Sequence, residues 1–330
     1  MITFSLSIIL APVSKDNDMA ESNISIPSSG LMLQATLDVN GATPGPAALL
    51  ISGSGPVDRD SNAKRLSINV MGQIAAHLAS EGITSLRYDK RGAGQSDGDY
   101  MRTGFHDNVD DARAAIDVLR DRPEVDPDQI VLIGHSEGAL IASALAQDEQ
   151  LAGVALLAGA ATNGKEVLRW QARQVAPTLP KPVKLLMKLL RQNLVQTQMK
   201  RLGRIESSTD DVIRIQLVKL NAKWFREFMS FEPSNALRQA EAPVLAITGT
   251  KDIQVNPDDV SLMERAVPAS FTGHLIEDMT HLLRTEPGVA SVRTYKKQAR
   301  QPLDQRLMTL LTEWIETVTQ TKNGTNDEHL

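Results

Sequence analysis

The 330-residue chain contains no cysteine. This excludes disulfide bonds, thiolate metal sites and a cysteine nucleophile, so any nucleophile in the protein is an oxygen or a nitrogen. Aromatic residues are also scarce, at 4% of the chain, and a formal net charge of −5 offers no general attraction to nucleic acid. Because 42% of the residues are nevertheless hydrophobic, the composition predicts a globular protein with a real core and no nucleic-acid partner.

Hydrophobic runs long enough to cross a bilayer are absent as well. The apolar run from Ile2 to Val13 is too short for a membrane helix, and it lacks the preceding positive charge and the A-x-A-like cleavage site of a signal peptide. We therefore expect a cytoplasmic protein in which residues 1–19 are a disordered extension and the folded part begins near Ala20.

Short apolar segments recur along the rest of the chain and alternate with helical patterns. The apolar segments are typical of parallel strands that are covered on both faces, and they span Ala47–Ile51, Ile83–Tyr88, Ile130–Gly134, Gly153–Gly159 and Val244–Thr248. A further strand is predicted over Phe271–Glu277. Helical spacing occurs over Asn69–Ser80, Val109–Arg120, Ala139–Ala146 and Pro257–Ala266. This alternation predicts an α/β fold with a mostly parallel central sheet and helices on both faces. Ahead of it, the alternating segment Leu31–Val39 and the turn cluster Asn40–Pro46 predict a hairpin.

The stretch 162–240 interrupts the alternation, because it shows helical patterns and no strand signal. An insertion of this length is too long for a simple crossover and predicts a helical cap over the carboxyl edge of the sheet. The core then consists of residues 20–161 and 241–330. Within the cap, helical patterns cover 182–202 and 211–229.

The first half of the cap is strongly basic. Thr162–Arg204 holds ten Lys or Arg against one acidic residue, Glu166. Apolar residues at helical spacing between these cations favour a core-facing stripe with a solvated basic face. Two other interpretations stay open: the cap faces anionic or lipid-like substrates or makes weak contact with an anionic membrane surface, or its apolar face joins a homodimer.

The segment Gly134-His135-Ser136-Glu137-Gly138 stands between a predicted strand and a predicted helix. Gly-x-Ser-x-Gly in that position is typical of a sharp turn that presents the serine at its apex. A serine nucleophile needs a base, and the base needs a carboxylate to orient it. Asp252 and His281 each follow a predicted strand, in the chain order that such a turn requires, so Ser136, Asp252 and His281 are the predicted catalytic residues. His274 lies inside a strand pattern and is the weaker candidate for the base.

The oxyanion of an acyl-transfer intermediate needs two hydrogen-bond donors. We assign them to the backbone N–H of Glu137, which follows the nucleophile, and of Ser54, in the Gly-rich turn after Ala47–Ile51, with Gly55 as the alternative. Asp58, Arg59 and Asp60, which follow in this turn, are predicted to form a structural network of ion pairs and hydrogen bonds. Asp89 and Arg91 are predicted to belong to a structural turn.

These residues, together with "YDKRGAGQSDG" over Tyr88–Gly98, resemble the α/β-hydrolase family of serine esterases from about residue 24 to 318. The resemblance implies the α/β-hydrolase fold and hydrolysis of acyl esters. Ser52 departs from the family pattern, because many members carry His there.

The predicted function is therefore that of a serine carboxylesterase acting on short- to medium-chain acyl esters through a Ser-His-Asp acyl-enzyme mechanism. No cofactor and no metal are expected, since no His, Asp and Glu grouping has metal-ligand spacing. Candidate pocket residues are Gly55, His135, Trp170, Trp224, Phe225 and Phe228. Same-fold alternatives are an acyl-thioesterase or acyltransferase and a prolyl-type peptidase, and a catalytically silent small-molecule-binding module is the alternative of another class.

Overall fold

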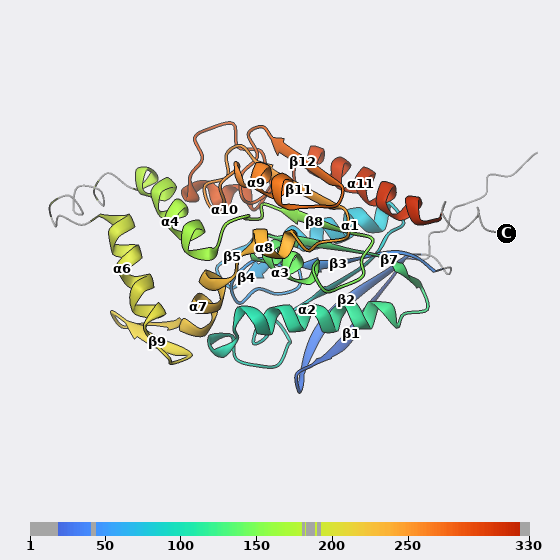
Figure 1. Ribbon diagram of the computed structural model, residues 1–330, viewed down its shortest axis with the longest axis horizontal. Helices are drawn as coiled ribbons and strands as arrows, with labels where there is room; N and C mark the ends of the chain where they lie inside the picture. The colour runs from blue at the N-terminus through green and yellow to red at the C-terminus, as the bar shows by residue number, and fades with distance from the viewer. Residues whose placement is uncertain (1–18, 41–43, 180–181, 183–188, 190–192, 324–330) are drawn as a thin grey trace, which may run out of the picture.

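A computed structural model describes residues 19–40, 44–179, 182, 189 and 193–323. Its centre is an eight-stranded sheet of order β1-β2-β6-β3-β7-β8-β11-β12 (Figure 1). The strands are β1 (Met19–Ser28), β2 (Leu31–Asn40), β3 (Gly45–Ile51), β6 (Thr84–Tyr88), β7 (Val125–His135), β8 (Gly153–Leu157), β11 (Val244–Gly249) and β12 (Phe271–Ile276). From β6 to β12 every pair of neighbours is parallel, whereas β1 and β2 run antiparallel at one edge. The predicted mostly parallel sheet is confirmed.

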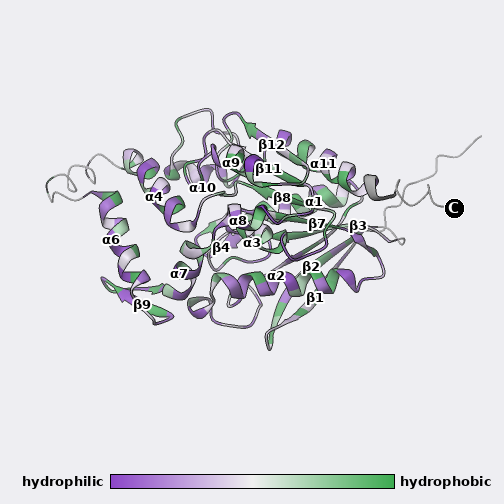
Figure 2. Ribbon diagram, in the orientation of Figure 1, coloured by the Kyte–Doolittle hydropathy of each residue, from purple (hydrophilic) through white to green (hydrophobic). Residues whose placement is uncertain are grey.

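Helices cover both faces of the sheet. On one face lie α1 (Val70–Ser80) and α11 (Gln305–Asn323), and on the other lie α2 (Phe105–Arg120), α3 (Glu137–Leu145) and α9 (Asp259–Ala266). In β7, Ile130 and Leu132 join one hydrophobic cluster while Val131 and Ile133 join the other. Alternate side chains of a strand point to opposite faces, so burial on both faces explains the unbroken apolar runs. Figure 2 shows apolar residues concentrated in these central strands.

The hairpin predicted across Asn40–Pro46 is wrong. β2 pairs with β1 and β6, and β3 lies on the far side of β6. The hairpin is instead β1–β2, which turns at Ser29 and Gly30 with φ of 48° and 80°. Positive φ at both turn residues suits the right-handed twist of the paired strands. Residues 41–43, in the middle of the predicted turn, lie outside the described residues.

The chain between β8 and β11, called the insertion below, runs from residue 158 to residue 243. It contains α4 (Gly164–Val175), the 3₁₀ turn η2 (Ala176–Thr178), α6 (Leu194–Glu206), α7 (Ala222–Ser230) and α8 (Pro233–Leu237). Figure 1 shows α4, α6 and α7 at one end of the molecule, opposite the end of α11. Most of the predicted helix over 182–202 before Leu194 lies outside the described residues. Among the helices that the structure does describe, none has the length and apolarity to cross a membrane.

The expectation that 162–240 lacks strands is also wrong. A two-stranded sheet, β9 (Val212–Ile215) and β10 (Val218–Asn221), replaces the first half of the helix predicted over 211–229. β-branched residues favour the extended conformation there, and the turn lies at Gln216 and Leu217, with φ of 49° and 66°. Because neither residue is Gly, Asn or Asp, the sequence carries no recognisable turn signal at this point.

Candidate active site

Ser136 stands alone between the end of β7 and the start of α3. Its φ of 57° and ψ of −116° lie outside the usual regions for a non-glycine residue. The two flanking glycines allow this turn. A Cβ on Gly134 would lie 2.1 Å from the carbonyl oxygen of Gly138, and a Cβ on Gly138 would lie 2.0 Å from that of Ile51. The strand-turn-helix predicted for this segment is therefore present, with the serine at its apex.

Ser136, His281 and Asp252 are joined by two hydrogen bonds. His281 Nδ1 lies 2.8 Å from Asp252 Oδ2, and His281 Nε2 lies 3.0 Å from Ser136 Oγ. The carboxylate can only accept, so Nδ1 carries the hydrogen and Nε2 is left to accept the serine O–H. The side chains of Asp252 and His281 are 0% and 5% exposed. This arrangement can transfer a proton from Ser136 to His281 while the carboxylate stabilises the resulting imidazolium.

The carboxylate of Asp252 is held in place by backbone N–H groups of its own loop. Its Oδ1 accepts from the backbone N–H of Gln254 at 2.7 Å and of Val255 at 2.9 Å. One carboxylate oxygen is thereby occupied, and the other faces His281. The loop that follows β11 thus supplies an oriented carboxylate, as its position after a buried strand predicts.

The loop that carries His281 is held by two buried side chains. His135 Nε2 donates to the carbonyl oxygen of His281 at 2.9 Å. Burial, and then the proximity of His281, lowers the pKa of His135 to about 3, so this ring is neutral. Arg284, which is fully buried, donates to the carbonyls of Leu282, Ile68 and Gln301. The backbone carbonyls of His281 and Leu282 are therefore both held by buried side chains.

The predicted oxyanion donors lie beside the nucleophile. A Cβ on Gly53 would lie 3.3 Å from Ser136 Cβ, so the turn after β3 packs against the serine. In the described chain, neither the N–H of Ser54 nor that of Glu137 donates to a protein acceptor. Both amides are therefore available to a ligand. Ser52, where the family pattern differs, bonds through its hydroxyl to Ser61 Oγ at 2.8 Å.

The side chain of Glu137 has partners that sequence reasoning missed. Its Oε2 lies 2.9 Å from Lys90 Nζ, and its Oε1 accepts from Trp224 Nε1 at 2.6 Å and from Asn108 Nδ2 at 3.1 Å. Glu137 is 3% exposed and Lys90 4%. The only hint in the sequence is a lysine directly after a buried strand, within the Tyr88–Gly98 motif.

Two cavities flank Ser136. One, of about 80 Å³, lies under the insertion, and its apolar wall consists of Leu140, Ala160, Val167, Leu168, Trp224, Phe228 and Val255. The other, of about 270 Å³, is lined on its far side by Val57, Ser61, Ala63, Leu66, Ile68, Leu282 and Tyr295. Ser54, Gln254 and His281 border both cavities.

Of the predicted pocket residues, His135, Trp224 and Phe228 line these cavities. The structure corrects the prediction for Gly55, Trp170 and Phe225, which line neither. Trp224 and Phe228 lie one helical turn apart on α7 and stack on each other, with 4.6 Å between ring centroids. Phe225 falls on another face of α7 and packs with a cluster inside the insertion. Tyr295, Leu66 and Ile68 were missed because they come from distant segments without any motif.

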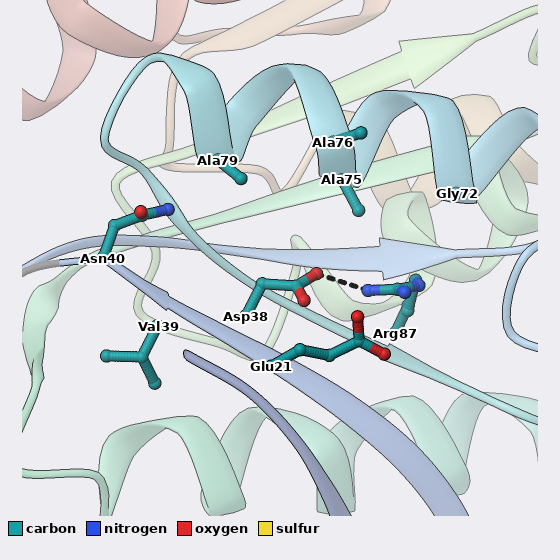
Figure 3. Close-up of a pocket in the computed structure, with 9 residues that line it drawn as sticks. All are labelled: Glu21, Asp38, Val39, Asn40, Gly72, Ala75, Ala76, Ala79 and Arg87. Carbon is teal, nitrogen blue, oxygen red and sulfur yellow. Dashed lines mark hydrogen bonds and ion pairs between the residues drawn. The ribbon is translucent and has the colours of Figure 1, made fainter. Parts of the chain in front are cut away.

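A third hollow, of about 380 Å³, lies between α1 and the β1–β2 edge. Figure 3 shows the small side chains of α1 above the ion pair of Arg87 with Asp38. None of Ser136, Asp252 and His281 lines this groove.

The charged residues around the Gly-rich turns form ion pairs outside the two cavities. Arg59 lies 2.8 Å from Asp89, and Arg91 lies 2.7 Å from Asp111. Although burial opposes it, bonding to Arg59 lowers the pKa of Asp89. Among the described residues, no group of three or more His, Asp or Glu is arranged to hold a metal ion.

Comparisons with known proteins agree with this geometry. Residues 66–288 match the family Hydrolase_4, described as serine aminopeptidase S33. Esterase EstD of Thermotoga maritima is 27% identical over 280 residues, which is 83% of this chain and 63% of EstD. The chain thus spans less than two thirds of that relative.

Two solved structures share the fold. Est1E from Butyrivibrio proteoclasticus with bound ferulic acid superposes with a TM-score of 0.58 at 17% identity, over 88% of this chain and 98% of that one. Proline iminopeptidase from Mycobacterium smegmatis gives 0.60 at 13% identity, over 91% and 100%. At these identities the likeness shows the fold alone.

Proposed function

Because the chain belongs to the Hydrolase_4 (serine aminopeptidase S33) family and has the α/β-hydrolase fold, we propose that it is a serine carboxylesterase for short- to medium-chain acyl esters. The observation that carries the proposal is the buried relay from Asp252 through His281 to Ser136. Ser136 and His281 line two cavities, which can receive the acyl group and the alcohol group of an ester. The similarity to an esterase over 83% of the chain supports ester hydrolysis.

The mechanism follows from the two hydrogen bonds. Ser136 Oγ attacks the ester carbonyl carbon as His281 Nε2 takes its proton, and Asp252 stabilises the imidazolium. The tetrahedral intermediate collapses, the bond to the alcohol oxygen breaks, and His281 returns the proton to the departing alcohol. Water then attacks the acyl-enzyme by the same route, which releases the carboxylic acid and restores Ser136.

The negative charge of the intermediate falls on the former carbonyl oxygen. The backbone N–H groups of Ser54 and Glu137, which have no protein acceptor in the described chain, receive it. Each such donor lowers the barrier by about 3 kcal/mol when it is aimed at the oxyanion before the reaction begins.

The charges around the site favour an ester over a peptide with a free amino terminus. An aminopeptidase needs an anion to hold the substrate's ammonium group. Among the described residues that line the two cavities, the carboxylate of Glu137 is occupied by Lys90, Asn108 and Trp224. Asp252, which holds His281, is fully buried behind it. Neither carboxylate is left for a cationic substrate.

A series of p-nitrophenyl esters from acetate to palmitate tests the proposal. We expect turnover to be highest for the short chains, because the apolar cavity under the insertion is small. The activity must disappear in Ser136→Ala but persist in Ser143→Ala, a matched control that removes a buried hydroxyl from α3, the helix that follows Ser136.

Amino-acid p-nitroanilides and acyl-CoA thioesters provide the competing substrates. Turnover of a p-nitroanilide or a thioester that exceeds ester turnover, and that depends on Ser136, would replace the carboxylesterase by a peptidase or a thioesterase. Ester hydrolysis that survives in Ser136→Ala would contradict the mechanism itself.

A further inference from the structure

The Lys90–Glu137 ion pair takes no part in the proton transfers described above, yet it is almost completely buried. The two side chains are 5% and 1% exposed, and Nζ lies 2.9 Å from Oε2. Removing two opposite charges from water costs free energy, and this cost can exceed the free energy gained from their attraction. A buried pair directly beside the nucleophile therefore calls for a functional explanation.

Lys90 also contacts the turn that supplies the first oxyanion donor. Its Nζ donates to the carbonyl oxygen of Gly53 at 3.1 Å. That carbonyl and the N–H of Ser54 belong to one planar peptide group. A cation on the oxygen fixes the orientation of the plane, and by polarising the amide it makes the N–H a stronger donor.

Glu137 supplies the second donor through its own backbone. Its carboxylate is held on both oxygens, by Lys90 on one and by Asn108 and Trp224 on the other. Asn108 comes from α2 and Trp224 from α7 in the insertion. These contacts fix the first residue of α3, and so the direction of its N–H.

The order of the sheet explains how one pair reaches both amides. Lys90 follows β6, Ser54 follows β3 and Glu137 follows β7, and these three strands are neighbours with parallel directions. Their carboxyl ends therefore meet at one edge of the sheet. The ion pair spans the middle strand, on whose loop the Ser54 amide lies.

We propose that Lys90 and Glu137 are positioning residues that aim the two backbone amides at the oxyanion. Lys90 acts through the Gly53–Ser54 peptide, and Glu137 acts through its own main chain. This inference rests on the proposed function, because it assigns these residues to the oxyanion hole of the same reaction.

The double variant Lys90→Met, Glu137→Gln tests it. Removing both charges together leaves no unpaired buried ion, and both replacements preserve volume, so the fold is retained. We expect kcat for a short-chain ester to fall about 10- to 100-fold with KM within about twofold, because the loss is confined to the transition state.

Inhibitors separate positioning from a structural role. A trifluoromethyl ketone forms a tetrahedral oxyanion with a serine nucleophile, whereas the alcohol obtained by reducing that ketone cannot. The ketone should bind the double variant more weakly by the same factor as kcat falls, and the alcohol should bind it as it binds the wild type. An unchanged ketone-to-alcohol affinity ratio in the double variant would overturn the inference.

Arg87→Met is the matched control. Arg87 lies on β6, its side chain is 11% exposed, and it pairs with Asp60 and with Asp38, the latter at the groove of Figure 3. This variant loses a comparably buried cation but keeps the wild-type affinity ratio. If the double variant fails to fold, Lys90→Gln, Glu137→Gln, which removes both charges but keeps a hydrogen-bond donor at position 90, takes its place, and kcat and the affinity ratio are measured in the same way.

The two proposals fail in different ways. A wild-type protein that neither hydrolyses esters nor reacts with the ketone contradicts the carboxylesterase. An active wild type whose double variant keeps kcat and the affinity ratio contradicts only the role of Lys90 and Glu137.

Discussion

At the scale of single residues, the sequence identifies the candidate catalytic side chains that directly follow a predicted strand or lie in the loop after one. Ser136 and Asp252 each follow a buried strand and His281 follows the edge strand β12, so the fold alone brings them to one edge of the sheet. The partners of Glu137 could not be predicted in this way. Its ion pair with Lys90 depends on two loops that meet only when β6, β3 and β7 are assembled in the observed order.

His135 gives a prediction at this scale. Its pKa is about 3 in the folded protein and about 6.5 when unfolded, so below pH 6.5 the unfolded state binds a proton that the folded state does not. Stability is therefore complete above pH 6.5 and falls as the pH drops towards 3. Between pH 7 and pH 5 we expect this residue to contribute a loss of about 2 kcal/mol in the free energy of unfolding.

Urea unfolding at the two pH values measures this loss. His135→Gln retains an N–H for the carbonyl of His281 but does not titrate, so its decline from pH 7 to pH 5 should be smaller than that of the wild type. The same decline in both proteins would show that His135 is not the group responsible.

At the scale of elements, strands were predicted correctly where burial on both faces produces a continuous apolar sequence. The central parallel strands β3, β7, β8 and β11 are buried on both faces and their sequences are continuous apolar runs, as β7 shows. The predictions failed where the strands are less buried. β9 and β10 are short and largely exposed, and the turn between them uses residues that give no signal in the sequence.

That turn offers the element-scale prediction. Gln216 and Leu217 both adopt positive φ, which costs free energy in side chains other than Gly, Asn and Asp, and Leu217 is 90% exposed. Replacing the pair by Asn-Gly should raise the free energy of unfolding by about 1 kcal/mol without loss of esterase activity. Denaturant titration measures the gain, and the reversed pair Gly-Asn is the control for composition. Equal or lower stability of the Asn-Gly variant would contradict the positive φ angles assigned to Gln216 and Leu217.

At the scale of the whole molecule, the chemistry depends on convergence from distant parts of the chain. The first half supplies Ser136 and the two amides of the proposed oxyanion hole, the second half supplies Asp252 and His281, and α7 of the insertion lines one cavity with Trp224 and Phe228. Alternation of strands and helices predicted the class of fold. It could not predict the order of the strands, and hence which side chains line the cavities.

The most direct measurement is the intact mass of the protein quenched during turnover of p-nitrophenyl butyrate, followed by peptide mapping. We predict that the wild type gains one butyryl group, that the group maps to Ser136, and that Ser136→Ala gains none while losing turnover. Butyryl transfer to another residue, or undiminished hydrolysis by Ser136→Ala, would contradict nucleophilic catalysis by Ser136.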